Sequence, residues 1–261
     1  MEAFGDVSLA IDDDVATAEV HRPPHNFFDA ELIASLADAY DAAARDGARA
    51  IVLCSEGKNF CAGADFSGRS RASGAVATGA VATGGAGQLY EQAVRLFEAP
   101  LPVIAAVQGK AVGGGMGLAC SADFRVITSQ TVFTANFSRL GLHHGFGLTV
   151  TLPAIIGQQR AWQMLYSGRP AIAEDAMKFG LAEYESPHPR QVAHEVAGWI
   201  AQAGPLAVRS IRKTMRGDLA ARVRQAMDHE RAEQEKLWQT ADFAEGVKAT
   251  AERRTPNFAG R

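Results

Sequence analysis

Apolar and polar residues alternate at the start of the chain, and this alternation predicts a β-hairpin. Its strands would run over 7–11 and 15–21, with an acidic turn between them. Beyond the hairpin, apolar residues recur at helical spacing, so a helix is expected from about 30 to 46. Asp29 is placed to cap this helix, and Gly47 to end it.

Strands and helices then alternate along the first two-thirds of the chain. A continuous apolar run predicts a strand at 50–55 that is buried on both faces. Further strands are expected at 102–107 and 124–128, and helices at 89–99, 146–156 and 158–167. This order of elements is typical of an α/β fold with largely parallel strands.

The last part of the chain is almost entirely helix-forming. Apolar residues recur there at every fourth position, namely at Ile211, Met215, Leu219, Val223 and Met227. Such a stripe predicts a packing face, either within one chain or between subunits. We therefore divide the chain into a core at 1–204 and a helical C-terminal region at 205–261.

Composition and charge narrow the class of protein. A chain of 261 residues with 47% apolar and 21% charged residues has the make-up of a soluble globular protein with a sizeable core. The net charge of −3 argues against nucleic acid or an anionic membrane as a partner. No apolar run reaches the ~18–20 residues of a membrane span, and the acidic N-terminus lacks the apolar segment of a secretory signal. Three cysteines without CxxC spacing indicate reduced thiols in a cytoplasmic protein, and we expect no metal site.

One segment, at 74–87, has a composition that does not suit a packed core. It contains the five-residue sequence GAVAT twice in tandem, and it consists of glycine, alanine, valine and threonine. Large apolar residues, which offset the entropy of ordering a chain, are missing from it. A mobile surface loop is expected here.

A glycine-rich stretch at 113–120, GGGMGLAC, follows a predicted strand and opens a helix. It fits neither the GxxxxGK[ST] loop of nucleotide-binding proteins nor a dinucleotide fingerprint, because Leu118 or Cys120 stands where that fingerprint needs a small residue. Glycines at a helix N-terminus instead let a group that develops negative charge approach unpaired N–H groups. A second small-residue loop at 62–64 would supply a second donor. The alternative is that both loops are tight turns at close-packed crossings.

Together, these segments resemble those of the crotonase superfamily, the enoyl-CoA hydratase/isomerase group. The resemblance covers nearly the whole chain and is carried by HRPPHNFFDAEL, AIVLCSEGKNFCAGADF, PVIAAVQGKAVGGGMGLACSADFRV, LGLHHGFG and AERRTPNFAGR. It implies a spiral of ββα units followed by a helical C-terminal region that assembles homotrimers, often paired into hexamers.

The resemblance also implies roles for individual residues. Ala64 and Gly114 would donate their backbone N–H groups to a thioester carbonyl, forming an oxyanion hole that stabilises an enolate. Other residues would bind the coenzyme A part of an acyl-CoA substrate, namely His25, Ala62, Phe66 and Arg253. Arg253 stands where the family has a lysine that meets a CoA phosphate, and His25 is alternatively a solvated loop histidine. Apart from coenzyme A within the substrate, no cofactor is expected.

Two positions depart from the pattern of the family's hydratases, which use two glutamates to hold a water and move its protons. Those positions are occupied here by Gly117 and Phe137, which carry no proton and would line an apolar acyl pocket. His143 is a candidate catalytic group, since an imidazole can act as acid or base near pH 7. His144 is the other candidate in the same turn, and the alternative is that both histidines are structural.

The sequence therefore predicts an acyl-CoA enzyme, a lyase or isomerase of fatty acid metabolism, whose reaction is not the standard two-glutamate hydration. A non-catalytic acyl-CoA binding protein is the alternative. Fold and motif resemblance do not by themselves decide between these functions.

Overall fold

The protein is described by a computed structural model, which covers residues 1–65 and 86–261. Phe66 and almost all of the tract at 74–87 lie outside the described residues. Within them, no helix has both the length and the apolar character needed to cross a membrane.

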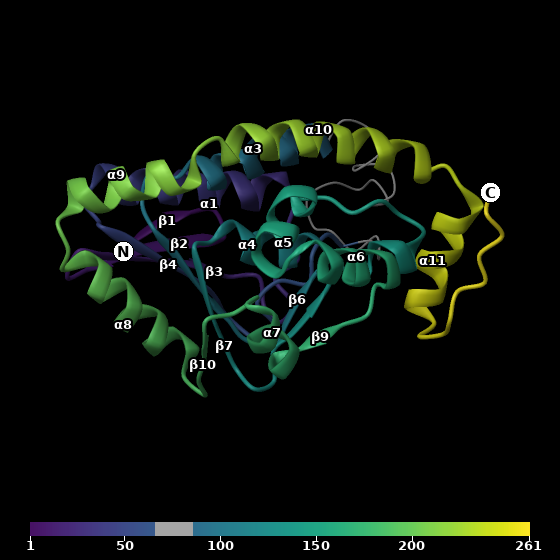
Figure 1. The fold of residues 1–261 in the computed structure, drawn as a ribbon, viewed down its shortest axis with the longest axis horizontal. Helices are drawn as coiled ribbons and strands as arrows, with labels where there is room; N and C mark the ends of the chain where they lie inside the picture. The colour runs from purple at the N-terminus through teal and green to yellow at the C-terminus, as the bar shows by residue number, and fades with distance from the viewer. Residues whose placement is uncertain (66–85) are drawn as a thin grey trace.

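The centre of the fold is a seven-stranded sheet (Figure 1). Its strands, in spatial order, are β1 (Glu2–Phe4), β2 (Val7–Asp12), β3 (Val15–Val20), β4 (Ala50–Ser55), β5 (Val103–Val107), β7 (Phe124–Ile127) and β10 (Tyr184–Glu185). The first three pair antiparallel, and from β3 onward every neighbouring pair is parallel. A smaller sheet holds β6 (Lys110–Val112), β8 (Val132–Thr134) and β9 (Ala171–Ile172). The largely parallel α/β fold expected from the sequence is confirmed.

Helices connect and cover these strands. They are α1 (Ala30–Arg45), α3 (Ala86–Glu98), α4 (Gly114–Ser121), the 3₁₀ helix η2 (Asn136–Leu140), α5 (Leu148–Ile156), α6 (Gln158–Ser167), α7 (Ala173–Phe179), α8 (Pro189–Ala201), α9 (Pro205–Arg216), α10 (Leu219–Leu237) and α11 (Ala241–Ala251). The helices predicted before residue 168 are confirmed to within three residues at each end.

Local signals in the sequence account for the first elements. The hairpin between β2 and β3 turns through Asp13 and Asp14, which both take a positive φ, as a tight two-residue hairpin turn requires. Helix α1 begins as predicted, because the Asp29 side chain accepts a hydrogen bond from the Leu32 N–H (2.9 Å). An ordinary capping contact thus starts the helix that closes one face of the sheet.

Both faces of the central sheet are buried. Along β4, Ile51 and Leu53 belong to one apolar core, while Val52 and Cys54 belong to another. Helix α8 packs on the second face, and α1, with α3 and α10 outside it, covers the first (Figure 1). A strand buried on both sides explains why the run at 50–55 is apolar throughout.

The helical tail does not form one continuous packing face. Gly217, with a φ of 52°, lies between α9 and α10 and divides the predicted stripe in two. Val223 and Met227 on α10 are buried, whereas Ile211 and Met215 on α9 are 62% and 80% exposed. The α10 part of the stripe thus packs within the chain, and both a subunit contact for the α9 part and the division of the chain at residue 204 stay predictions.

Candidate active site

Two backbone segments that are distant in the sequence run side by side at the pocket. Phe60 N donates to Gln108 O (2.8 Å), and Cys61 N donates to Lys110 O (3.1 Å). The Cys61 carbonyl in turn accepts from Val112 N (3.0 Å), so the pairing is parallel. Both segments therefore reach the same place, one ending in residues 62–64 and the other in the first turn of α4.

The glycines of these segments are required by the close approach of the two backbones. Gly63 has a φ of 82°, and a Cβ atom there would lie 2.7 Å from the Val112 oxygen and 3.6 Å from the Gly114 nitrogen. A Cβ atom on Gly115 would lie 2.2 Å from the Cys61 oxygen. The close-packed crossing that the sequence left open as an alternative is thus present in the structure.

Two backbone N–H groups lie where this crossing meets the pocket. A parallel bridge joins Phe28 to Ala64, with Phe28 N donating to Gly63 O (3.0 Å). Because such a bridge engages the peptide groups on either side of the bridged residue, the Ala64 N–H points to the opposite edge. Gly114 is the first residue of α4, so its N–H has no acceptor within the helix. Ala64 and Gly114 both line the pocket, as do Ala62 and Gly63.

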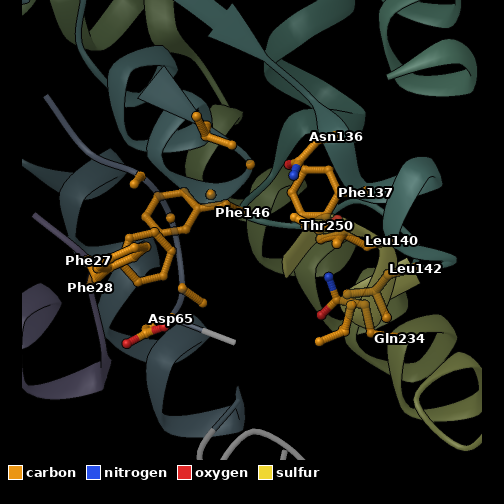
Figure 2. A pocket seen from close by; sticks show the side chains of 18 of the residues that line it. Phe27, Phe28, Asp65, Asn136, Phe137, Leu140, Leu142, Phe146, Gln234 and Thr250 are labelled. Carbon is orange, nitrogen blue, oxygen red and sulfur yellow. The ribbon is translucent and has the colours of Figure 1, made fainter. Parts of the chain in front are cut away.

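The pocket itself is a cavity of about 350 Å³ with a largely apolar wall (Figure 2). This volume lies within the range of ~300–1,000 Å³ that is usual for small-molecule sites. Aromatic rings line it on both sides, among them Phe28, Phe137 and Phe146. Asp65 is the one carboxylate among its described lining residues, and in Figure 2 it lies on the same side as Phe28.

Gly117 and Phe137, which stand where the resemblance places two glutamates, differ in their surroundings. Phe137 on η2 lines the pocket. Gly117 on α4 is not among the lining residues, because Phe146 covers it. A Cβ atom on Gly117 would lie 2.6 Å from the Phe146 Cβ and 2.9 Å from its Cγ and Cδ1.

A polar pair that the sequence analysis missed holds the turn carrying Phe146. The Tyr90 hydroxyl on α3 donates to Gln234 Oε1 on α10 (3.0 Å), and Gln234 Nε2 donates to the His143 carbonyl (3.0 Å). Both side chains line the pocket, and burial raises the pKa of Tyr90 well above its usual range. Tyr90 and Gln234 are 144 residues apart, so no local pattern in the sequence signals the pair.

The histidines of the turn contact each other and helix α5. His143 Nδ1 donates to the His144 carbonyl (2.7 Å), the two rings stack with centroids 4.2 Å apart, and neither is among the described lining residues. His144 Nε2 lies 2.9 Å from Thr149 Oγ1, and the Thr149 hydroxyl donates to the buried Glu230. Burial, together with the neighbouring imidazoles, lowers the pKa of His144 to about 4.

The residues predicted to bind coenzyme A are only partly brought together at the pocket. Ala62 lines the pocket, and Arg253 follows the lining residue Ala251 by two positions. His25 is exposed, with its Nδ1 2.7 Å from Asn59 Nδ2, and it does not line the pocket. The structure therefore brings Ala62, Ala64, Gly114 and Phe137 together, while Gly117, His25, His143 and Arg253 lie outside the described lining.

Comparison with known proteins adds an independent observation. The family model for enoyl-CoA hydratase/isomerase matches residues 10–261. The "Probable enoyl-CoA hydratase EchA14" of Mycobacterium tuberculosis is 34% identical over 261 residues, covering 97% of this chain and all of that protein. The "Crotonyl-CoA hydratase" of Syntrophomonas wolfei is 32% identical over 263 residues, covering 98% of each.

Solved structures agree with the sequence relatives. The crystal structure of an enoyl-CoA hydratase/isomerase from Pseudoalteromonas atlantica superimposes with a TM-score of 0.83 at 26% identity, covering 97% of this chain and 100% of that one. A structure of an enoyl-CoA hydratase from Mycobacterium avium gives a TM-score of 0.81 at 24% identity and supports the fold alone. The fold class expected from the sequence is confirmed by these neighbours.

Proposed function

Because the chain belongs to the enoyl-CoA hydratase/isomerase family, we propose that it binds an acyl-CoA thioester in this pocket. The thioester carbonyl would lie between the N–H groups of Ala64 and Gly114, which stabilise the enolate formed when a proton leaves the neighbouring carbon. Coenzyme A would extend past Ala62, with His25, Phe66 and Arg253 as contacts, in a cytoplasmic homotrimer or hexamer. The substrate supplies the coenzyme A, and the chain needs no other cofactor.

The observation that carries this proposal is that Ala64 and Gly114, from two segments distant in the sequence, both line the same pocket. It is supported by Gly114, which opens α4, since the first N–H groups of a helix carry partial positive charge. Backbone donors of this kind do not need to reorganise when charge develops, and losing one typically slows a reaction by ~10²–10³.

The apolar lining favours a reaction other than two-glutamate hydration. A general acid or base contributes roughly 10²–10⁴ to a rate. Gly117 and Phe137 cannot act in this way. His143 would serve only if its turn rearranged, because it is not among the described residues that line the pocket. The proposal therefore rests on the backbone donors, with proton transfer through the substrate or a displaced His143.

A non-catalytic acyl-CoA binding protein is the second candidate. It is favoured by the same lining, in which Asp65 is the one carboxylate among the described residues. The two candidates share the binding site and differ in whether a proton is exchanged there.

Carbonyl polarisation and proton exchange test the proposal separately. The infrared band of a carbonyl-¹³C butyryl-CoA should move to lower wavenumber on binding, because the N–H donors polarise the bond. In D₂O an enzyme exchanges the proton on the carbon beside the thioester, and a binding protein does not. An unshifted carbonyl band in a saturated complex would contradict the proposal.

A matched pair of variants locates the effect. Gly114→Ala places a Cβ atom 2.4 Å from the Phe28 Cζ, so the helix start must move and the band shift should be lost. Gly198→Ala on α8 meets nothing within 4 Å and serves as the control. Equal band shifts in the two variants would place the carbonyl elsewhere.

A further inference from the structure

The Phe146 side chain occupies the space that any side chain at position 117 would need. A Cβ atom on Gly117 would lie 2.6 Å from the Phe146 Cβ, and one on Gly114 would lie 3.5 Å from the Phe146 Cδ2. The two glycines are three positions apart on α4 and so share one face of the helix. One buried ring therefore lies against the face of α4 that carries Gly114 and Gly117.

An unusual backbone conformation and two contacts from other segments fix the position of this ring. Phe146 has a φ of 60°, a left-handed conformation that is unusual for a bulky residue. The Phe28 ring lies against it, with centroids 5.4 Å apart. The Phe146 N–H is hydrogen-bonded to the Tyr90 hydroxyl, which donates to Gln234. Packing and hydrogen bonds thus impose an unusual backbone conformation, which indicates that the position of the ring is specified.

From this arrangement we propose that Phe146 is the specificity-determining residue of the pocket. It closes the cavity over Gly117 and lies beside Gly114, so that the site accepts acyl groups that are unbranched at the carbon next to the thioester. Acyl groups branched at that carbon bind more weakly. The inference rests on the proposed function, because that function places the thioester carbonyl beside Gly114.

The physical reason is the rigidity of a packed aromatic wall. A carbonyl held at the Gly114 N–H brings the next carbon of the acyl group against Phe28 and Phe146. A methyl branch on that carbon needs additional space. In a core packed at crystal-like density, such space arises only when the surrounding side chains move. The same ring offers no hydrogen bond to a water molecule, so the space is apolar as well as filled.

The first test measures the coupling between Gly117 and Phe146 by thermal unfolding. Gly117→Ala should lower the Tm in the wild-type background, because the new Cβ meets the ring. In the Phe146→Gly background the same substitution should leave the Tm unchanged or raise it. Gly115→Ala is the control, because its Cβ would meet the Cys61 oxygen at 2.2 Å and is not relieved by removing the ring.

The second test measures selectivity by titrating butyryl-CoA and 2-methylbutyryl-CoA. The wild type should bind the unbranched thioester about tenfold or more tightly, which is the usual range for one methyl group in an apolar pocket. Phe146→Gly should bring the ratio close to one, whereas Leu142→Ala, which enlarges the other side of the pocket (Figure 2), should keep the preference. If Phe146→Gly does not fold, Phe146→Leu should lower the ratio in the same direction.

Each outcome has a defined meaning. Equal losses of Tm on Gly117→Ala in both backgrounds, or an unchanged ratio in the Phe146 variants, would overturn the inference. If the wild type binds neither thioester, the proposed function fails, while the unfolding experiment still decides whether Phe146 and Gly117 form one packing unit.

Discussion

Replacing Asp123 by asparagine should destabilise the fold far more than removing an exposed carboxylate. Asp123 follows α4 and receives three hydrogen bonds, from Val103 N (2.8 Å), Arg212 Nε (3.0 Å) and Arg216 Nε (2.9 Å). The three side chains of this cluster are 10–17% exposed. The cluster anchors α9 to the sheet, and α9 leads into α10, which carries the pocket residue Gln234.

The size of the effect follows from two arginines that share one carboxylate. Burial already lowers the pKa of Arg212, so its charge depends on Asp123 for compensation. Breaking a buried ion pair by removing one partner costs about 3–5 kcal/mol. Since the asparagine still accepts from Val103 N and the cluster is slightly exposed, we expect a loss of about 3 kcal/mol in the free energy of unfolding.

Urea unfolding followed by circular dichroism measures this loss directly. Asp218→Asn is the matched control, because Asp218 pairs with Arg222 at an exposed site and should contribute less than about 1 kcal/mol. The difference should persist at high salt, since buried pairs are screened much less than exposed ones. Equal destabilisation by the two substitutions would refute the reasoning that Asp123 is the electrostatic anchor of α9.

Three further predictions concern the pocket and its turn. The pKa of His144 is lowered from 6.5 to about 4, so as the pH falls the unfolded chain is protonated at this histidine before the folded chain is. The free energy of unfolding should therefore decrease between pH 6.5 and pH 4, by at most about 3 kcal/mol, since a pKa shift of one unit corresponds to ~1.4 kcal/mol. Gly63→Ala should destabilise the fold and abolish acyl-CoA binding, because its Cβ would lie 2.7 Å from the Val112 oxygen at a φ of 82°. Tyr90→Phe should cost about 1–3 kcal/mol, since it leaves Gln234 without its hydroxyl partner.

Each of these has its own measurement and contrary result. For the histidine, urea unfolding across the pH range is compared with His144→Gln, and parallel curves would assign the pH dependence to other groups. For the glycine, butyryl-CoA titration and thermal unfolding apply, with Gly198→Ala as control. For the tyrosine, urea unfolding suffices, and unchanged stability would show that the hydroxyl contributes nothing to holding the turn.

The pattern of neighbouring residues in the sequence was enough to predict those elements that are stabilised by interactions between neighbouring residues. The hairpin, the capped start of α1 at Asp29 and the buried strand β4 each follow from residues next to one another in the chain. The small residues at 62–64 and 113–115 also signalled a close backbone approach. That signal was sound because glycine is required wherever two backbones leave no room for a Cβ atom.

Contacts between distant segments carried no such signal. The Tyr90–Gln234 pair, the cover of Phe146 over Gly117 and the anchoring of α9 by Asp123 each join residues on different elements. A His143 near the reacting atoms was a reasonable expectation from its turn. In the structure Phe146 of this turn lines the pocket, whereas His143 is not among the described lining residues, and its catalytic role stays a prediction.

Periodicity and small-residue spacing thus specify which segments are strands or helices and where two backbones can cross, because those properties depend on neighbouring residues. The shape of the pocket is a property of side chains that meet only after folding. Whether position 117 faces open space or a phenyl ring depends on a residue 29 positions away, and only the packed chain brings the two together.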